Sequence, residues 1–162
     1  MSESLSIAFQ GAARTVTGSR HLIRFGDRHV LFDCGLYQGR RDEAERINRT
    51  FAFNPAELDA VVLSHAHLDH TGNLPTLHAQ GYAGPAHATP ATADLSSVML
   101  PDSAQLMARD LEHVNRRRRP GVPERAPLYG MADVERTLEG MRTHGYHEAF
   151  EVVPGMTAEY FD

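Results

Sequence analysis

The chain has 162 residues, 41% of them apolar and 23% charged, which is the size and composition of a single globular domain. Its net charge of −5 argues against a surface that attracts nucleic acid everywhere, so any contact with nucleic acid has to be local. No apolar segment approaches the roughly 18 consecutive residues that a membrane span requires, so we expect no membrane partner.

The start of the chain and its cysteine content both bear on the compartment. Residues 1–4 contain no basic region of the kind that opens a targeting signal. The single cysteine, Cys34, cannot form an internal disulfide and fits a reducing compartment, where we expect it to be a small buried residue. We therefore expect a cytoplasmic protein.

Three strands are predicted near the N-terminus. Residues 5–9 alternate apolar and polar side chains with a period of two, and residues 21–25 and 29–32 follow, separated by a Gly-Asp turn. This pattern predicts an antiparallel hairpin. The loop between the first two strands, residues 11–19, is rich in Gly, Thr and Ser. It is either a connecting turn or a segment whose backbone approaches an anion.

Two segments lead from this hairpin to a central strand. Residues 37–50 carry charges of alternating sign and predict a solvated helix or loop. Asn54 and Pro55 are typical of a helix start, with Asn as the cap and Pro in the first turn. Residues 60–63 are short, apolar and rich in β-branched side chains, which predicts a strand buried on both faces.

Four potential metal ligands follow this strand within six residues: His65, His67, Asp69 and His70. Side chains at positions i and i+2 of extended backbone share a face, so His65 and His67 can close on one cation. Asp69 and His70 then point to a second position nearby. Imidazole nitrogens with one carboxylate suit zinc, with iron and manganese as weaker candidates. The sequence therefore predicts a metal site at the end of this strand.

The next segments carry two further histidines to which we assign no ligand role. Residues 74–78 have helical spacing, Gly81 is placed to end that helix, and His78 belongs to its surface or packing. Residues 85–89 predict a short strand. Its His87 lies near enough in the chain to approach the site, but coordination geometry requires more than a nearby imidazole.

A long helical region, residues 90–115, is interrupted by Pro101, which should break or kink it. Four arginines, residues 116–119, then open a basic, proline-containing excursion. Such a charge run is usually a solvated loop. In a chain that is otherwise acidic, the alternative is a local contact with the RNA backbone.

The C-terminal part predicts one helix and one strand pair. Residues 132–144 have an amphipathic helical pattern, and residues 149–153 and 157–161 predict two strands around a Pro-Gly turn. In this interpretation His144 and His147 belong to a helix end and a turn, and neither is assigned to a metal.

Several motifs together resemble one protein family. Residues 65–70 have the His-x-His-x-Asp-His form of the metallo-β-lactamase superfamily. The continuation in residues 71–75, the loop 11–19 and the Phe-Asp-Cys-Gly motif of residues 32–35 are similar to its β-CASP branch, the RNA-processing nucleases related to the polyadenylation-factor nuclease. The resemblance extends over nearly the whole chain and concerns the N-terminal part of the family's domain.

This resemblance implies a fold and a domain organisation. The fold class is α/β, as the N-terminal half of the four-layer αβ/βα sandwich of metallo-β-lactamases. Residues 1–162 would form a truncated metallo-β-lactamase domain that lacks the second half and the inserted β-CASP domain. The last strand would then be unpaired, which favours a homo-oligomer.

The resemblance also implies an activity, the zinc-dependent cleavage of RNA phosphodiesters, with RNA as the partner and two zinc ions as cofactors. His65 and His67 would hold the first ion, and Asp69 and His70 the second. Asp69 would in addition orient the attacking water as the catalytic residue. Asp33 would steady the metal loop without binding the metal itself.

Other functions share the same four ligands. A β-lactamase of this fold is normally secreted, and a diiron flavoprotein relative usually has Glu at the position of His67. Only residues 72–75 and the loop 11–19 favour the nuclease over a glyoxalase II-like thioesterase. The family's third histidine, bridging aspartate, final histidine and leaving-group acid have no counterpart in the chain. We therefore expect the 162-residue chain alone to be inactive, and a non-catalytic metal-binding fragment remains an alternative.

Overall fold

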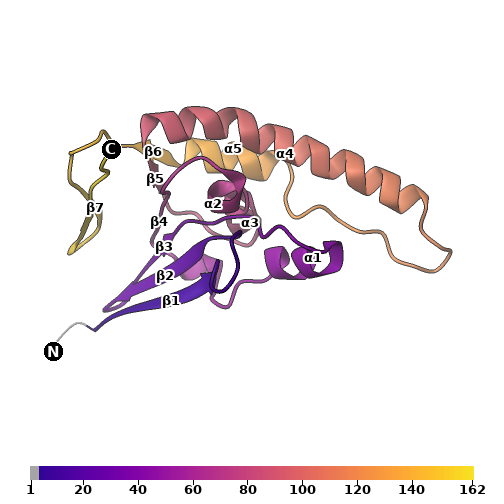
Figure 1. Cartoon of the computed structure of the whole chain (residues 1–162), viewed down its shortest axis with the longest axis horizontal. Coiled ribbons are helices and arrows are strands. Elements are labelled where there is room, and N and C mark those ends of the chain that lie inside the picture. Colours follow the sequence, from indigo (N-terminus) through magenta and orange to yellow (C-terminus); the bar gives the residue numbers. More distant parts are fainter. Residues whose placement is uncertain (1–3) are drawn as a thin grey trace.

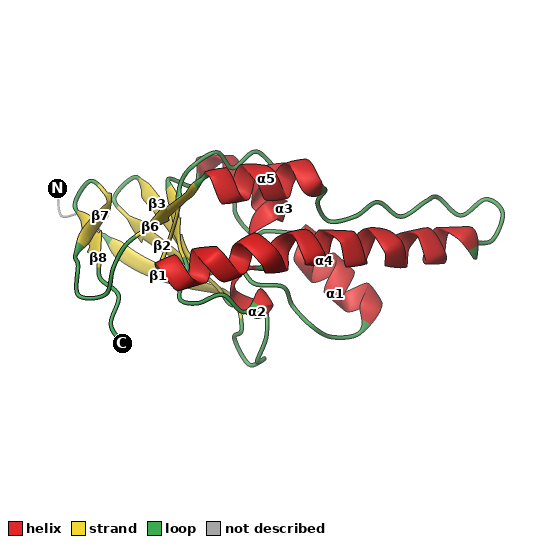
Figure 2. Ribbon diagram, turned by 90° about the horizontal axis from the view of Figure 1, so that it is seen from above, coloured by secondary structure: helices red, strands yellow, loops and turns green. Residues whose placement is uncertain are grey.

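The computed structural model describes residues 4–162; residues 1–3, on which part of the targeting prediction rests, lie outside the described residues. A six-stranded sheet forms the centre of the molecule (Figure 1). The helices gather on one side of this sheet, and a small β-hairpin lies on the other (Figure 2). The predicted α/β fold class is thus confirmed.

The strands of the sheet follow the order β1-β2-β3-β4-β5-β6. The first three are antiparallel: β1 (Leu5–Gly11), β2 (Arg20–Phe25) and β3 (Arg28–Phe32). Three parallel strands extend them: β4 (Ala60–Val62), β5 (Ala86–Ala88) and β6 (Met141–Thr143). A separate hairpin consists of β7 (Phe150–Val153) and β8 (Met156–Ala158). The predicted N-terminal and C-terminal hairpins are both present.

Five α-helices and one short 3-10 helix are present in the described part of the chain. They are α1 (Arg41–Arg49), the 3-10 helix η1 (Pro55–Glu57), α2 (Leu68–Thr71), α3 (Leu74–Ala79), α4 (Pro90–Arg116) and α5 (Met131–Glu139). Asn54 caps η1 as predicted, since its Oδ1 accepts from the Ala56 N–H at 3.2 Å. None of the described helices is both long and apolar enough to cross a membrane.

Alternate residues of the central strands bury opposite faces of the sheet. On the helical side, Leu31, Val61 and Leu63 pack with Leu74 and Leu77 of α3. On the other side, a second cluster joins β3 and β4 to the β7–β8 hairpin; its members are Val30, Ala60, Val62, Val152, Val153 and Tyr160. The strand leading to the histidines is therefore buried on both faces, as predicted, and gives the following loop a rigid starting point.

Pro101 lies inside α4, so of the predicted break or kink at this residue the break was wrong. Proline lacks the N–H that would bond to the carbonyl four residues earlier, so the helix loses one hydrogen bond there. However, Leu100 and Ala104 on either side are buried against Tyr129 and Val134. Figure 1 shows α4 as one continuous helix. Tertiary packing of this face compensates for the lost hydrogen bond.

The predicted helix over residues 132–144 was too long. Helix α5 ends at Glu139, and residues 141–143 form the edge strand β6 instead. Gly140 ends the helix, and its carbonyl accepts from the Ala86 N–H at 3.1 Å, which starts the parallel pairing of β6 with β5. Met141 fits a helical apolar face equally well by spacing, so the sequence pattern did not reveal the change.

Candidate metal centre

A buried carboxylate, Asp33, lies beneath the histidine loop. It directly follows β3, with a left-handed φ of 61°, and its N–H donates to the Val62 carbonyl at 2.9 Å. Its side chain is 2% exposed. It accepts hydrogen bonds from Ser64 N–H at 2.8 Å, Ser64 Oγ at 2.9 Å and Ser19 Oγ at 3.2 Å. Asp33 therefore joins the ends of β3 and β4, where it was predicted to steady the loop.

His70 is oriented by the same carboxylate. Its Nδ1 lies 2.7 Å from Asp33 Oδ2 and donates to it. The other ring nitrogen, Nε2, lies 3.6 Å from Asp69 Oδ2. Both side chains are about one quarter exposed, at 23% and 24%. In the neutral ring this bond places the proton on Nδ1 and the lone pair on Nε2, next to the Asp69 carboxylate.

His65 and His67 form a second pair. His65 Nε2 lies 3.2 Å from His67 Nδ1, and the two rings meet edge to face. Because Ser64 Oγ donates to Asp33, it accepts from His65 Nδ1 at 3.0 Å, which assigns the proton to Nδ1 and leaves Nε2 as a lone pair. Burial, together with the nearby His70 and His67, lowers the pKa of His65 and favours the neutral ring that a metal requires.

Backbone hydrogen bonds hold the short helix α2 against the end of β3 and the start of β2. Ser19 N–H donates to the Asp69 carbonyl at 2.8 Å, and Cys34 N–H donates to the His70 carbonyl at 2.7 Å. Gly35 allows this close approach, because a Cβ on Gly35 would lie 1.5 Å from the Asp69 carbonyl oxygen. Cys34 is buried in the core as expected, and burial raises the pKa of its thiol to about 12.

The predicted site residues lie together as two pairs of donor atoms: His65 with His67, and Asp69 with His70. Within residues 4–162 no group of three or more His, Cys, Asp or Glu side chains is arranged to hold a metal ion. Ser64 and Ser19 had not been singled out. Their only signal is their position beside the metal motif and at the end of the loop 11–19.

His87 lies against His144 rather than within either pair. His87 Nδ1 is 2.8 Å from His144 Nε2, and the His144 ring stacks on Phe150 with a centroid distance of 3.6 Å. His144 follows β6, not a helix end as predicted. Burial, followed by the proximity of His144 and Arg142, lowers the pKa of His87 to about 4. This second histidine pair joins strand β5 to the C-terminal hairpin.

Comparison with known proteins identifies relatives over most of the chain. The profile of the metallo-beta-lactamase superfamily matches residues 16–157. Ribonuclease TTHA0252 of Thermus thermophilus is 44% identical over 138 residues, which are 85% of this chain and 28% of that protein. Transcription termination factor FttA of Methanocaldococcus jannaschii is 34% identical over 110 residues, which are 68% of this chain and 17% of that factor.

A subclass B3 metallo-beta-lactamase isolated from a soil metagenome library is similar in structure, with a TM-score of 0.49 at 18% sequence identity. The similarity covers 95% of this chain and 48% of that enzyme. The chain thus spans 28% and 17% of the length of the two curated relatives described above and about half of this solved structure.

Proposed function

Because the chain belongs to the metallo-β-lactamase superfamily, a family that binds divalent metal ions, we propose that its histidine loop contributes to a two-zinc site for RNA cleavage. The observation that carries the proposal is the pair of donor sets above Asp33. Two bonds of about 2.0–2.1 Å from one tetrahedral ion place their donor atoms roughly 3.3 Å apart. The separations of 3.2 Å and 3.6 Å fit this value.

In this proposal each pair serves one ion. His65 Nε2 and His67 Nδ1 are the ligands of the first, and Asp69 and His70 Nε2 are the ligands of the second. Three imidazoles and one carboxylate favour zinc over the harder cations that prefer oxygen ligands alone. Asp33 is a positioning residue, because its bond to His70 Nδ1 fixes which nitrogen of that ring faces the ion.

The proposed reaction is in-line attack of water on the phosphorus of an RNA phosphodiester: the bond from the water oxygen to phosphorus forms while the opposite P–O bond to the leaving oxygen breaks. The water gives up a proton to solvent, and the leaving oxygen takes one up from solvent. When bound, two metal ions supply the positive charge that stabilises the attacking and leaving oxygens and the acidity that makes water a nucleophile at neutral pH. Asp69 accepts a hydrogen bond from the attacking water and orients it. The relative named a ribonuclease, at 44% identity, supports RNA as the substrate.

Because the chain spans 28% of that relative's length, the activity is proposed for the whole protein and not for residues 1–162 alone. We propose that these residues are the N-terminal half of the metallo-β-lactamase domain. Each ion has two donors here, whereas zinc sites normally have at least three protein ligands. The remaining ligands would come from outside this stretch. Metal binding without turnover is therefore the second candidate function for the chain by itself, favoured by the absence of a three-donor group among residues 4–162.

Two further proposals concern location and assembly. An RNA substrate agrees with a cytoplasmic location. Self-association is supported by the edge strand β1, on which Leu5, Ile7 and Phe9 are 65%, 52% and 67% exposed. In the described part of the chain, β8 pairs with β7 alone, which leaves a second strand edge open.

The decisive experiment compares Asp69→Asn with wild type in the full-length protein, with zinc and a radiolabelled RNA. Loss of the orienting carboxylate should lower the cleavage rate at least about 100-fold, the usual contribution of a positioned acid or base. Asp94→Asn, an exposed position on α4, is the control and should leave the rate unchanged. Hydrolysis of a thioester with no cleavage of RNA would instead favour the glyoxalase II-like alternative.

A further inference from the structure

The arginine loop, residues 116–125, projects from the far end of α4. Figure 2 shows the end of α4 and the segment that follows extending beyond the rest of the molecule. The loop contains five arginines at positions 116–119 and 125, in a chain whose net charge is −5. Its position away from the sheet means that these side chains have no part in the core.

The base of the arginine loop is firmly held. The Asn115 side chain spans it: Nδ2 donates to the Arg125 carbonyl at 2.9 Å, and Oδ1 accepts from the Arg125 N–H at 3.0 Å. The Arg125 guanidinium pairs with Glu45 at 2.9 Å and Asp42 at 3.3 Å, both on α1. The loop is therefore a built projection anchored to two helices.

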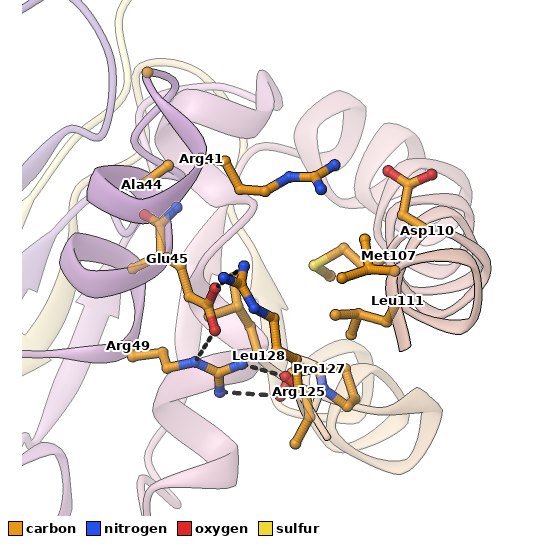
Figure 3. Close-up of a pocket in the computed structure, with 14 residues that line it drawn as sticks. Arg41, Ala44, Glu45, Arg49, Met107, Asp110, Leu111, Arg125, Pro127 and Leu128 are labelled. Carbon is orange, nitrogen blue, oxygen red and sulfur yellow. Dashed lines mark hydrogen bonds and ion pairs between the residues drawn. The ribbon is translucent and has the colours of Figure 1, made fainter. Parts of the chain in front are cut away.

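Beside this anchor an open pocket of about 360 Å³ lies between α1, α4 and residues 125–128. Figure 3 shows the side chains that line it. Arg49 is directed at Glu45 and at the carbonyls of Ala126 and Pro127, so its donors are used within the protein. Together with Arg125, this arginine has a structural role at the base of the loop and is not available to a ligand.

The four consecutive arginines divide into two kinds. Arg116 pairs with Glu112 at 3.1 Å, and Arg118 pairs with Glu124 at 3.0 Å and also donates to the Val122 carbonyl at 2.7 Å. The Arg118 contacts close the loop upon itself, whereas the Arg116 pair lies within α4. The side chains of Arg117 and Arg119 are exposed and have no ion-pair or hydrogen-bond partner among residues 4–162.

We propose that Arg117 and Arg119 contact phosphates of the RNA substrate, whereas Arg116 and Arg118 are engaged by Glu112 and Glu124 within the protein. The proposal rests on the proposed function, since RNA is the polyanion that the site would act on. Two unpaired guanidiniums on a projection anchored at its base match the repeating charges of an RNA backbone, because arginine binds phosphate with a planar fork of donors.

The contact would lie several nucleotides from the bond that is cleaved. Leu68, in the helix that carries Asp69, packs on the cluster that contains Ala104 of α4. A rise of 1.5 Å per helical residue places Arg117 about 20 Å further along the helix. Only an RNA long enough to cover this distance can reach both the metal centre and the tip of the loop.

The test measures RNA affinity of the 162-residue chain at 50 and 200 mM salt, without metal, for Arg117→Gln/Arg119→Gln and for the matched control Arg116→Gln/Arg118→Gln. Each phosphate contact contributes roughly 0.7 to the salt slope for single strands. The loss of two contacts should therefore make the fall in affinity between these salt concentrations about sevenfold smaller. The control removes the same charge and should retain most of the wild-type slope. Arg117→Lys/Arg119→Lys should retain it too, since the positive charge remains.

Length provides the second arm. In the full-length protein with zinc, where the metal centre fixes the cleaved bond, an RNA of about 4 nucleotides should be cleaved with the same KM by both double variants, whereas one of about 20 nucleotides should distinguish them. Equal weakening by both double variants would show that net charge and not contact is responsible, and would overturn the proposal. If Arg117→Gln/Arg119→Gln lost binding of polyglutamate but kept its RNA affinity, the loop would instead bind an acidic polypeptide. Neither result affects the Asp69 experiment, so the two proposals fail separately.

Discussion

Two histidine clusters lie in this molecule, and they differ in what lies beneath them. His70 donates to the buried carboxylate of Asp33, and Ser64 links the same carboxylate to His65. The pair formed by His87 and His144 has an aromatic ring, Phe150, against it instead, and His87 Nε2 is buried without a hydrogen-bond partner in the described part of the chain. The first arrangement favours a bound cation, and the second disfavours any positive charge.

The largest expected effect concerns metal affinity at the first cluster. The chain should bind zinc weakly, because each ion has only two donors, and His65→Ala/His67→Ala should abolish binding at that pair. Calorimetric titration of zinc into both proteins measures the stoichiometry. His113→Ala, at an exposed position of α4, is the control. Unchanged stoichiometry in the double variant would contradict the assignment of these ligands.

Removing the carboxylate beneath the first cluster should destabilise the fold. Asp33→Ala leaves the buried donors of Ser64 and Ser19 unpaired, and we expect a loss of about 3–5 kcal/mol in the free energy of unfolding. Urea denaturation measures this change. Asp94→Ala serves as the exposed control and should change the free energy by less than about 0.5 kcal/mol. A tolerated Asp33→Ala that also binds zinc normally would show that the carboxylate orients nothing.

The second cluster should make the protein less stable as the pH falls. A histidine in a salt bridge has the opposite effect, because its contribution is lost as the pH rises. The pKa of His87 is lowered to about 4, so the unfolded chain, with an ordinary histidine pKa of about 6.5, binds more protons between these values. The contribution of the neutral His87 to the free energy of unfolding is therefore fully present above pH 6.5 and is lost as the pH drops toward 4. The loss is on the order of 3 kcal/mol.

His87→Gln removes this titration while it keeps a polar side chain next to His144. Thermal unfolding of both proteins at several pH values between 4 and 7 should show a flatter profile for the variant. Identical profiles would mean that the His87 ring is not responsible for the loss of stability on acidification.

The same contrast explains what the sequence could predict. The four potential ligands lie within six residues after a buried strand, so their grouping follows from local spacing, and Asp33 followed from the resemblance to a family motif. His87 and His144 are brought together only by the parallel pairing of β5 with β6. That strand was hidden because Met141 also continues the apolar face of the preceding helix.

The remaining differences have the same origin in tertiary packing. Pro101 argues locally for a helix break, but the buried Leu100 and Ala104 beside it keep α4 intact. The division of the arginine run into paired and free side chains depends on where Glu112 and Glu124 lie, which spacing alone indicates only for the i, i+4 pair of Glu112 with Arg116.

The backbone hydrogen bonds that hold α2 also determine when the metal centre forms during folding. Its ligands are contiguous in the chain, yet Ser19 and Cys34 hold the turn from positions far away in the sequence. Such long-range contacts require closure of large loops, which is entropically costly and slow, so the site should form late, together with the pairing of β3 and β4. A synthetic peptide of residues 64–71 contains every donor of the two pairs but lacks Ser19 and Cys34, which make these hydrogen bonds. It should therefore lack the ordered geometry that the folded chain gives to the same residues.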